Sequence, residues 1–436
     1  MKINPLEWIK LYKPLPVSLG QIKAKITEVS GKGMLLTGVQ ESAVKSVLSQ
    51  PVPLIVQRIN ESFPFEVTLS QVFCDENKGV FVLFSKSQMV LANRLLGQIR
   101  KNQHIDLCQN VDVESEGKDN GLSEVELVPK ATPELDWNDL DTSQKFLGKS
   151  FSLPVLITGM TGGVEKGTKI NEILAREAVA WGIPMGVGSQ RIALESPEYA
   201  EIFQVKRDVP DVFLIGNIGA SQLLSEADPV SYCKRAVDMI QADAMAIHLN
   251  ALQECIQPEG DRHFKGVLDC IQKVCAGLHI PVLIKEVGAG MDLSSAKMLV
   301  AAGAKGIDVG GKGGTSWGYI EGLRSADPQT QKIAELYRNW GLSTGRSLNA
   351  LARSGLFGQT DLVATGGIRN GLEVAKACAL GASMAGIGLP LLRAALVSRE
   401  DVHKELSFIK RSLCIAMLVT GSRTIADLKF SLSKFD

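Results

Sequence analysis

The feature that most constrains the fold is a repeated alternation of short apolar runs and helical stretches, beginning near residue 154 and continuing to the C-terminus. Eight apolar runs lie at residues 154–159, 184–187, 212–215, 244–249, 282–286, 306–309, 362–365 and 383–387. Helical patterns stand between them, for example at 169–181, 294–302 and 372–380. Such alternation is typical of βα units around a parallel sheet. Because eight parallel strands close a barrel, we predict a TIM (β/α)8 barrel.

The gap after the sixth run, residues 310–361, is unusually long for this fold and contains helical patterns at 329–340 and 346–353. Both a lid and an interface are compatible with an insertion at this position. Glycine-rich or polar residues follow most of the eight runs. In TIM barrels the C-terminal ends of the strands carry the active site, so we look for chemistry there.

The first part of the chain has a different pattern. Short β-branched runs recur at residues 22–29, 34–39, 52–58, 65–73 and 79–85, with possible helices at 41–48 and 87–98. We therefore predict a small β-rich N-terminal domain over residues 1–96, of unknown role, and a barrel domain over residues 97–436. Residues 106–141 carry eleven carboxylates against two lysines, which predicts a solvated acidic connection.

Charge and hydropathy argue against two classes of partner. Lys and Arg total 47, Asp and Glu also total 47, and no block of like charge is long enough to favour nucleic acid or an anionic membrane. No apolar run approaches the roughly 18 residues that a membrane span needs. The first residues include Asn4, Pro5, Glu7 and Lys10 where a signal peptide would be apolar. We expect a cytoplasmic protein.

Glycines after the seventh and eighth runs predict a phosphate site. Gly366 and Gly367 follow run seven, and Gly386 and Gly388 end run eight. In TIM barrels this position often holds phosphate on backbone N–H groups, which glycine leaves open to close approach. Ordinary turns also use paired glycines. Lys285 on run five, with Ser189, Asn217 and Thr315 as neutral hydrogen-bonding groups, would suit a flavin mononucleotide (FMN) whose reduced, anionic ring the lysine favours.

The densest polar cluster spans residues 248–254, where His248, Asn250, Gln253 and Glu254 emerge from an otherwise apolar strand. A buried strand end has no structural need for four such groups, although His248 alone could be a satisfied core residue. Mg²⁺ commonly binds through one carboxylate plus substrate phosphates, so Glu254 as a metal ligand implies a phosphorylated substrate.

Two basic sites fit a phosphorylated substrate. Arg100 and Lys101 stand together with His104 nearby, and Arg191 stands beside Ser189. The plain alternative for Arg100 and Lys101 is an exposed helix end, since both residue types are usually found at the surface.

At these residues the chain resembles the type 2 isopentenyl-diphosphate isomerases, a flavin-dependent family, from about residue 99 to the C-terminus. The matching motifs are Arg100-Lys101 with His104, Pro133-Glu134-Leu135, Asp141-Thr142-Ser143, Phe146-Leu147-Gly148-Lys149, Met160-Thr161-Gly162-Gly163, Val187-Gly188-Ser189-Gln190-Arg191, Asn217-Ile218-Gly219, residues 248–254 and 258–262, Lys285-Glu286-Val287-Gly288, residues 310–317 and Thr365-Gly366-Gly367-Ile368. The motifs occur in the family's order.

The resemblance implies a TIM-barrel isomerase that interconverts isopentenyl and dimethylallyl diphosphate, using reduced FMN, Mg²⁺ and NADPH as the reductant. It implies that the FMN is held by Gly159, Met160, Thr161, Ser189, Asn217, Lys285, Thr315, Gly366, Gly367, Arg369, Gly386, Ile387 and Gly388. It implies that the small-molecule diphosphate is met by Arg100, Lys101, His104, Ser189, Arg191, His248, Asn250 and Gln253. Gln253 would lie near the reacting carbons, Glu254 would ligate Mg²⁺, and a homo-oligomer, tetrameric or larger, is expected.

The mechanism we favour is protonation of the terminal alkene carbon and loss of a proton from C2, with the reduced flavin as the acid–base group. A carbocation-like transition state needs nearby negative charge, which explains a redox cofactor in an isomerase. Gln253 would orient the reacting carbons or relay a proton. The chain departs from the family at three places: Gln103 where an acidic residue is usual, Ile387 where methionine is usual, and the added residues 1–96.

Two other functions fit parts of the same sequence. An FMN-dependent oxidoreductase on the same barrel would use the same phosphate site. Such an enzyme needs a general-base histidine at the end of one of the last strands of the barrel. His279 and His403 are the last two histidines, and neither ends an apolar run. An inactive barrel that serves as a scaffold for residues 1–96 is the second; Gln253, Glu254 and Lys285 argue against it, because loss of function would free them to change.

Overall fold

The computed structural model describes residues 9–19, 22–30, 33–37, 51–58, 61–75, 79–84, 89–160, 162, 164–258, 260–356 and 358–433. The chain divides into two compact units. The first comprises Met1–His104, Ile256–Gly260 and Tyr319–Glu335, and the second comprises Ile105–Cys255, Asp261–Gly318 and Leu336–Asp436. The domain boundary near residue 96 stays a prediction, and helix α2 (Met89–Asn110) runs without a break through it.

The first unit contains a closed antiparallel barrel of six strands in the order β1-β2-β3-β6-β5-β4. The strands are β1 (Ile9–Leu19), β2 (Ile22–Ser30), β3 (Gly33–Thr37), β4 (Pro51–Arg58), β5 (Glu61–Asp75) and β6 (Gly79–Phe84). All five predicted strands of this region are present. The helix predicted at residues 41–48 lies outside the described residues.

Strand β1 is the one strand of this six-stranded barrel that was not predicted from the sequence. Its segment contains Pro14 and Pro16, and proline cannot donate to a ladder, so the pattern did not look like a strand. The pairing of β1 with β2 is irregular between Lys10 and Leu15, which is where Pro14 falls. An irregularity of this kind lets a strand continue past a missing donor.

The second unit contains a closed barrel of eight parallel strands in the order β10-β11-β12-β13-β14-β15-β16-β9. The strands are β9 (Val155–Ile157), β10 (Met185–Gly186), β11 (Leu214–Gly219), β12 (Ala244–Leu249), β13 (Val282–Glu286), β14 (Gly306–Asp308), β15 (Asp361–Thr365) and β16 (Met384–Ile387). This confirms the TIM-barrel prediction. One boundary was wrong: the third strand was expected at 212–215, but pairing with β12 continues to Gly219, so Asn217 lies within the strand.

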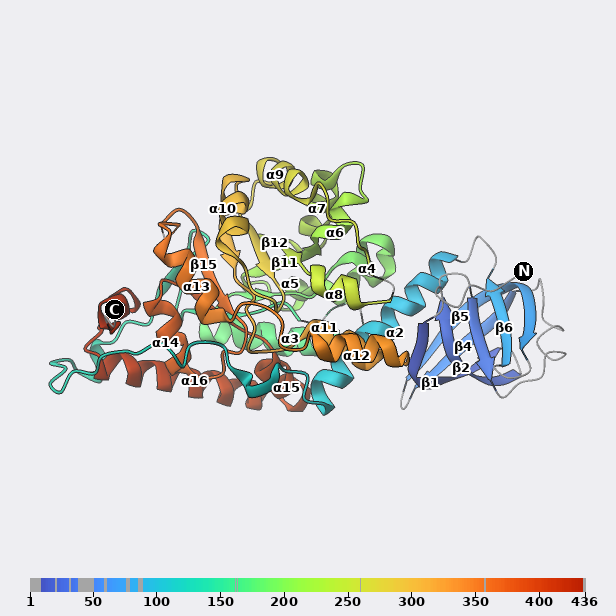
Figure 1. Ribbon diagram of the computed structural model, residues 1–436, viewed down its shortest axis with the longest axis horizontal. Coiled ribbons are helices and arrows are strands. Elements are labelled where there is room, and N and C mark those ends of the chain that lie inside the picture. The colour runs from blue at the N-terminus through green and yellow to red at the C-terminus, as the bar shows by residue number, and fades with distance from the viewer. Residues whose placement is uncertain are drawn as a thin grey trace. The chain divides into compact units, whose positions relative to one another are not determined.

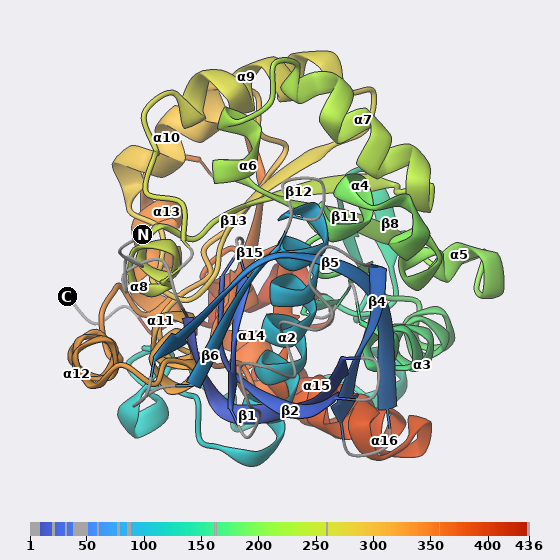
Figure 2. The ribbon, with the colours of Figure 1, turned by 90° about the vertical axis from the view of Figure 1, so that its right-hand side faces the viewer.

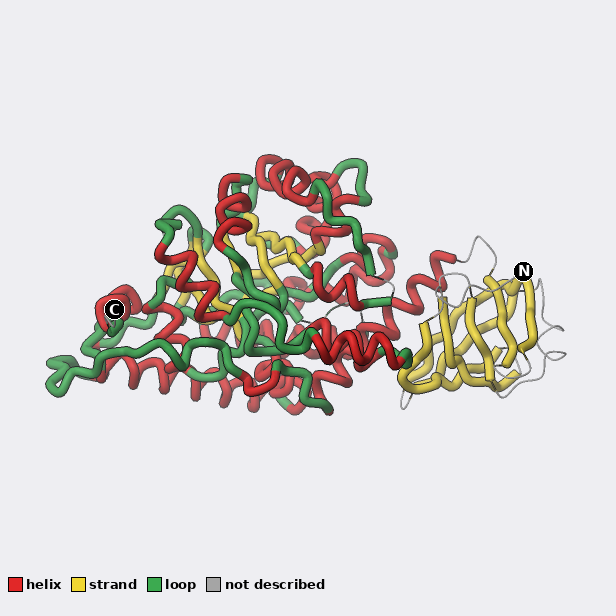
Figure 3. The backbone as a smooth tube through the Cα atoms, viewed as in Figure 1, coloured by secondary structure: helices red, strands yellow, loops and turns green. Residues whose placement is uncertain are grey.

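Helices surround this barrel, as Figures 1 and 3 show. The helices before β14 are α3 (Glu165–Trp181), α4 (Arg191–Glu195), α5 (Val205–Asp208), α6 (Ala220–Leu224), α7 (Pro229–Ile240), α8 (Ala251–Ile256), α9 (Val267–Gly277) and α10 (Leu293–Ala301). Those after it are α13 (Thr344–Arg353), α14 (Gly371–Ala379), α15 (Leu389–Val397) and α16 (Arg399–Val419), whereas α11 (Trp317–Arg324) and α12 (Pro328–Leu336) belong largely to the first unit. Helices α7, α9 and α10 form an arc outside β11, β12 and β13 (Figure 2). Helix α16 packs against α14 and α15.

The insertion between β14 and β15 is more helical than predicted. Helices α12 and α13 confirm the two helical patterns, although α12 ends at Leu336 rather than near residue 340. Helix α11 was not predicted. Of the helices within the described ranges, none is both long and apolar enough to span a lipid bilayer.

A hairpin closes the N-terminal end of the eight-stranded barrel. It consists of β7 (Gln144–Phe146) and β8 (Lys149–Phe151), and Phe146 and Phe151 join the buried cluster formed by inward residues of the strands. The Phe151 and Phe213 rings meet edge to face at 5.2 Å. The Leu147 amide donates to Asp361, the first residue of β15, at 2.8 Å. Because this end is filled with side chains, the opposite end of the barrel remains for polar groups.

The prediction of a solvated connection at residues 106–141 was wrong in its central part. Glu114, Ser115 and Asn120 are each only 4% exposed. Asn120 donates to the Gly367 carbonyl and to Glu373, at 2.8 Å in both cases. The segment therefore packs over the loops that follow β14 and β15. The acidic composition was misleading because a few buried, paired carboxylates look the same in sequence as exposed ones.

Candidate active site

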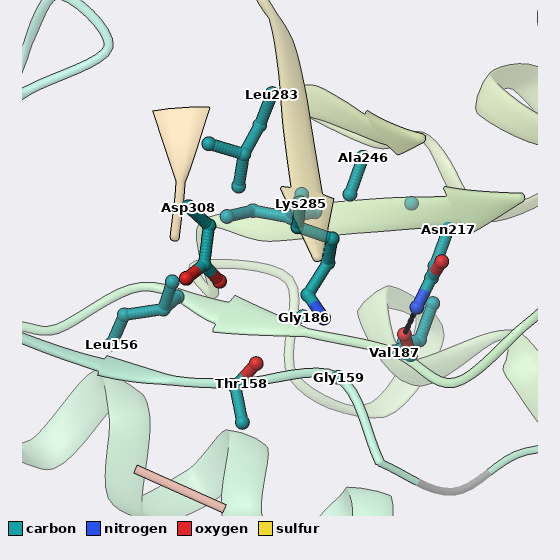
Figure 4. Close-up of a pocket in the computed structure, with 12 residues that line it drawn as sticks. Leu156, Thr158, Gly159, Gly186, Val187, Asn217, Ala246, Leu283, Lys285 and Asp308 are labelled. Atoms are coloured by element: carbon teal, nitrogen blue, oxygen red, sulfur yellow. Dashed lines mark hydrogen bonds between the residues drawn. The ribbon is translucent and has the colours of Figure 1, made fainter. Parts of the chain in front are cut away.

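A pocket opens inside the eight-stranded barrel, and side chains from neighbouring strands line it (Figure 4). Its lining consists of Leu156, Thr158, Gly159, Gly186, Val187, Ile215, Gly216, Asn217, Ala246, Leu283, Lys285 and Asp308. Three residues predicted for FMN, namely Gly159, Asn217 and Lys285, thus line one cavity. A Cβ at position 159 would collide with the Val187 carbonyl, so only glycine fits this wall.

Asn217 is held by three neighbours. Its side-chain amide donates to the Val187 carbonyl at 2.9 Å (Figure 4), and its Oδ1 lies 2.8 Å from His248 Nδ1. The side chain of Gln190, which is fully buried, accepts a hydrogen bond from the Asn217 backbone at 2.9 Å. This network fixes both Asn217 and the ring of His248, which orients the remaining ring nitrogen of His248.

The polar cluster after β12 is built around the Glu254 carboxylate. Asn250 donates to Oε1 at 2.8 Å, and the Asp261 backbone amide donates to Oε2 at 2.9 Å. Glu254 is 7% exposed and Asn250 is 6% exposed. Each carboxylate oxygen keeps a further lone pair for a ligand. A fixed, hard oxygen donor of this kind suits Mg²⁺.

The glycine loops after β14 and β15 pack closely against each other. A Cβ at Gly366, whose φ is 121°, would collide with the Gly311 carbonyl, and a Cβ at Gly367 would collide with the Gly313 carbonyl. A Cβ at Gly314 would come within 2.6 Å of the Gly367 nitrogen. The glycines are therefore required for backbone packing in addition to any role in phosphate binding.

Arg369 has a different environment from the one expected of a ligand-binding side chain. It forms an ion pair with the buried Glu114 and donates to the carbonyls of Gly367 and, at 3.1 Å, Gly313. Lys118 also pairs with Glu114, at 3.0 Å. The Arg369 side chain thus ties together the loops after β14 and β15. Any contact to FMN by Arg369 stays a prediction.

The other predicted residues of the second unit lie after strand ends or on β16. Met160 follows β9, Ser189 and Arg191 follow β10, Gln253 lies in α8, Thr315 follows β14, Gly386 and Ile387 are in β16, and Gly388 follows it. Arg191 pairs with Glu195 at 2.7 Å and has a side chain that is 47% exposed. Thr161, like Gly163 of the same motif, lies outside the described residues.

Arg100, Lys101 and His104 lie in α2, within the first unit. His104 Nε2 lies 3.0 Å from Glu321 Oε1, and burial lowers the pKa of His104. Burial opposes ionisation of Glu321, but the Arg324 guanidinium and His104 hold the pKa of Glu321 below its usual range. His104 of α2 thus joins Glu321 and Arg324 of α11 in a charged cluster. Arg100, Lys101 and His104 are partly buried and lie inside α2, so they do not form an exposed helix end.

Two glutamines join this cluster. Gln103 accepts a hydrogen bond from Arg324 Nε at 3.2 Å, so the neutral residue at this position lies within the network. With its amide oriented to satisfy both neighbours, Gln257 accepts from Arg100 at 2.9 Å and donates to Glu321 at 3.3 Å.

Three buried residues near these sites were given no role from the sequence. They are Gln190, Asp308 and Glu321, each fully buried. Asp308 had a detectable signal, because it is a lone carboxylate within the apolar run at 306–309 and such residues are seldom buried without a partner. Gln190 and Glu321 gave no comparable signal, since polar residues are ordinary in loops and helices.

The carboxyl of Glu286, at the end of β13, makes a testable pH prediction. Its Oε2 accepts from the amides of Val287, Gly288 and Ala289 at 2.6 to 2.7 Å, yet burial raises its pKa to about 7 from 4.5. Between these values the folded protein holds a proton that the unfolded chain has lost, so stability falls as pH rises through that window. In the wild type, the free energy of unfolding should therefore fall between pH 5 and pH 7. Glu286→Gln stays neutral, so we expect this fall to be smaller in the variant by on the order of 2 kcal/mol.

Urea unfolding of the wild type and Glu286→Gln at pH 5, 6 and 7 measures the effect. The amide oxygen of glutamine can still accept the three N–H groups, so the loop conformation is preserved. Equal pH slopes for the two proteins would contradict the prediction.

Solved structures show the same fold. A mandelate oxidase variant with a monooxide FMN adduct has a TM-score of 0.51 and 19% identity, and covers 75% of this chain and 94% of its own. A second mandelate oxidase structure has a TM-score of 0.53 and 18% identity, and the match covers 79% of this chain and 97% of that one. At such low identity the likeness concerns the fold alone.

Sequence relatives are much closer. The family model described as FMN-dependent dehydrogenase matches residues 220–434. The isopentenyl-diphosphate delta-isomerase of Nostoc sp. is 40% identical over 334 residues, which are 77% of this chain and 95% of that protein. Those of Pyrococcus abyssi and Archaeoglobus fulgidus are 42% identical, covering 76% of this chain and 90% and 93% of theirs. Because these relatives are matched over nearly their whole length, the chain belongs to the isopentenyl-diphosphate delta-isomerase family of enzymes.

Proposed function

We propose that this enzyme interconverts isopentenyl diphosphate and dimethylallyl diphosphate. The observation that carries the proposal is the identity of 40–42% to isopentenyl-diphosphate delta-isomerases over at least 90% of their length. The Asn250–Glu254 contact and the His248 ring held by Asn217 support it, because a diphosphate bound with a divalent ion needs hydrogen-bond donors and a carboxylate.

FMN is the proposed cofactor, with NADPH as its reductant. The barrel pocket fits a flavin, since it offers a wall that only glycine can form at position 159, a fixed amide at Asn217 and a buried cation at Lys285. The loops with Gly366, Gly367 and Gly388 would hold the FMN phosphate on backbone N–H groups. The match to the FMN-dependent dehydrogenase family model supports the same assignment.

Mg²⁺ is proposed to bind Glu254 together with the diphosphate of the substrate. Asn250 and the Asp261 amide hold the carboxylate in place, so the ion would find a rigid oxygen donor. The bound ion and Arg191 would neutralise the diphosphate, whose binding energy then positions the small reacting end.

The reaction adds a proton to the terminal alkene carbon and removes one from C2, with no net redox change. The reduced flavin, when bound, would supply the acid–base group and the negative charge close to the alkene. Lys285 holds positive charge at the flavin pocket, and Gln253 orients the reacting carbons or relays a proton. His248, held by Asn217, and Ser189 donate to the diphosphate.

An anaerobic assay tests the proposal. Purified protein with isopentenyl diphosphate, FMN, Mg²⁺ and NADPH in deuterated buffer should give dimethylallyl diphosphate carrying deuterium, followed by proton NMR. The same mixture without NADPH should give none. A protein that binds FMN but forms no product would overturn the isomerase proposal and favour oxidisable substrates. A protein that binds no FMN would favour the scaffold role.

Arg191 is expected to act mainly on substrate affinity. Its charge would meet the diphosphate equally in the ground state and the transition state, so Arg191→Gln should raise KM for isopentenyl diphosphate about tenfold with a smaller change in kcat. The matched control is Arg207→Gln, because Arg207 is a 56% exposed arginine paired with Glu201 and Asp208. A fall in kcat with unchanged KM would show that Arg191 acts in the chemical step instead.

Residues 1–96 are proposed to form a domain separate from the isomerase domain, and the protein is proposed to assemble as a homo-oligomer. The relatives support the first point, because they match only about three quarters of this chain while being covered almost completely themselves.

A further inference from the structure

Lys285 and Asp308 are direct neighbours across two parallel strands. Lys285 lies in β13 and pairs in register with Asp308 of β14. Residues opposite each other in a sheet project to the same face, here the interior of the barrel. Both side chains line the same pocket, as Figure 4 shows. The pocket therefore contains a buried cation and a buried carboxylate side by side.

Each member of this pair is fixed by its own hydrogen bonds. Asp308, which is fully buried, accepts from the Thr365 hydroxyl at 2.9 Å and from the Gly310 amide at 3.2 Å. Lys285 is 8% exposed and donates to the Glu286 carbonyl at 3.2 Å. Burial raises the pKa of Asp308, while the Lys285 charge and the two donors oppose that rise. The donors on both carboxylate oxygens favour the ionised form.

A buried ammonium without a counter-charge is costly, and opposite charges interact strongly where water is excluded. A flavin in this pocket would experience the sum of the two charges. A lone Lys285 would favour the reduced, anionic flavin strongly, whereas an adjacent carboxylate would weaken that preference. The role of Asp308 thus follows from its position beside Lys285.

We propose that Asp308 is the counter-ion of Lys285 and sets the net charge of the flavin pocket, and thereby the reduction potential of the bound FMN. This inference rests on the proposed FMN site. Asp308 acts through the charge of Lys285, which it offsets from the neighbouring strand; it is not assigned a contact with the diphosphate substrate. The balance of charges would let the flavin be reduced by NADPH without trapping it in one state.

The test is the midpoint potential of FMN bound to four proteins: wild type, Asp308→Asn, Lys285→Met and the double variant. Asp308→Asn, which is isosteric, should shift the equilibrium toward reduced flavin by about tenfold, equivalent to a potential about 30 mV more positive. Lys285→Met should shift the potential in the opposite direction. The double variant should return close to the wild-type potential, because both charges are then absent.

Asp361→Asn is the matched control, since Asp361 is another carboxylate of the barrel that is bonded to Leu147 and Ser383 away from the pocket. It should leave the potential unchanged. Thr365→Val provides a second variant that disfavours the ionised form of Asp308 by removing one donor, and it should shift the potential in the same direction as Asp308→Asn. This variant keeps the test decisive if Asp308→Asn does not fold.

An unchanged potential in Asp308→Asn and Thr365→Val, with lower unfolding temperatures, would show a purely structural role and overturn the inference. A shift of Asp308→Asn in the same direction as Lys285→Met would also overturn it. The potential is measured without turnover, so a protein that binds FMN but lacks isomerase activity still tests the inference. A wild-type protein that binds no FMN would overturn the cofactor proposal and this inference together, before any variant is compared.

Discussion

Glu254→Gln is expected to lower isomerase activity at least about 100-fold, because the proposed Mg²⁺ loses its protein carboxylate and with it much of the charge that stabilises the bound diphosphate. Glutamine keeps the shape of the side chain and one oxygen acceptor, so the Asn250 contact at 2.8 Å can persist. Its amide nitrogen would face the Asp261 amide donor in place of Oε2, so checks on folding separate the loss of charge from a change in the loop. We also expect the Mg²⁺ concentration for half-maximal activity to rise at least tenfold.

The measurement is initial rate against Mg²⁺ concentration, with circular dichroism and FMN binding as checks on folding. Glu172→Gln is the control, because Glu172 is a 45% exposed glutamate paired with Arg176 on α3. It should behave as the wild type. If Glu254→Gln kept its activity and its Mg²⁺ dependence, Glu254 could not be the metal ligand, and the carboxylate would have only the structural role that its hydrogen bonds already describe.

Gly366→Ala is expected to destabilise the protein by about 2 to 6 kcal/mol and to abolish measurable FMN binding. Two separate effects add. At φ 121° an alanine is strained by about 1 to 3 kcal/mol. Its Cβ would also collide with the Gly311 carbonyl and stand 2.6 Å from the Thr344 hydroxyl, and forced overpacking of this kind costs about 1 to 3 kcal/mol.

The Cβ added at position 366 would collide with the backbone of Gly311. Relieving this collision would move the loop after β14 away from the loop after β15. Both loops belong to the proposed phosphate site, so binding and stability should fall together. Gly355→Ala separates the two effects, since Gly355 has φ 76° but no atom within 4 Å of the added Cβ. The free energy of unfolding of the control should fall by about 1 kcal/mol, and the control should bind FMN normally. Chemical unfolding and flavin fluorescence titration measure the two quantities. Normal FMN binding by Gly366→Ala would remove this loop from the site.

The sequence anticipated the barrel because its signal is local. Each βα unit shows its own apolar run, so seven of the eight strands fell close to their predicted positions and the polar strand ends could be located. One strand that was missed, β1, contains prolines that hide a strand pattern, and the misplaced third strand contains Asn217, a polar residue that looks like a strand end. In both cases a local rule was overridden by pairing with a neighbouring strand.

The candidate site was anticipated in part for the same reason. Motif residues such as Lys285, Asn217 and Glu254 could be named from the sequence, since glycine and polar residues at strand ends are visible there. The contacts that hold them could not be predicted. Gln190 binds Asn217, Asn250 binds Glu254, and Glu114 pairs with Arg369. These contacts join segments that are distant along the chain, and their existence depends on how the chain folds.

By itself, the sequence determined the parallel barrel and the polar and glycine residues that follow its strands. Only the tertiary structure decided which of those residues meet. Asp308 shows the difference: in the sequence it is one carboxylate in a short apolar run, and it becomes the neighbour of Lys285 only when β13 and β14 pair and the barrel closes around them. Strand register and burial are non-local properties, and the energy of a charge depends on both.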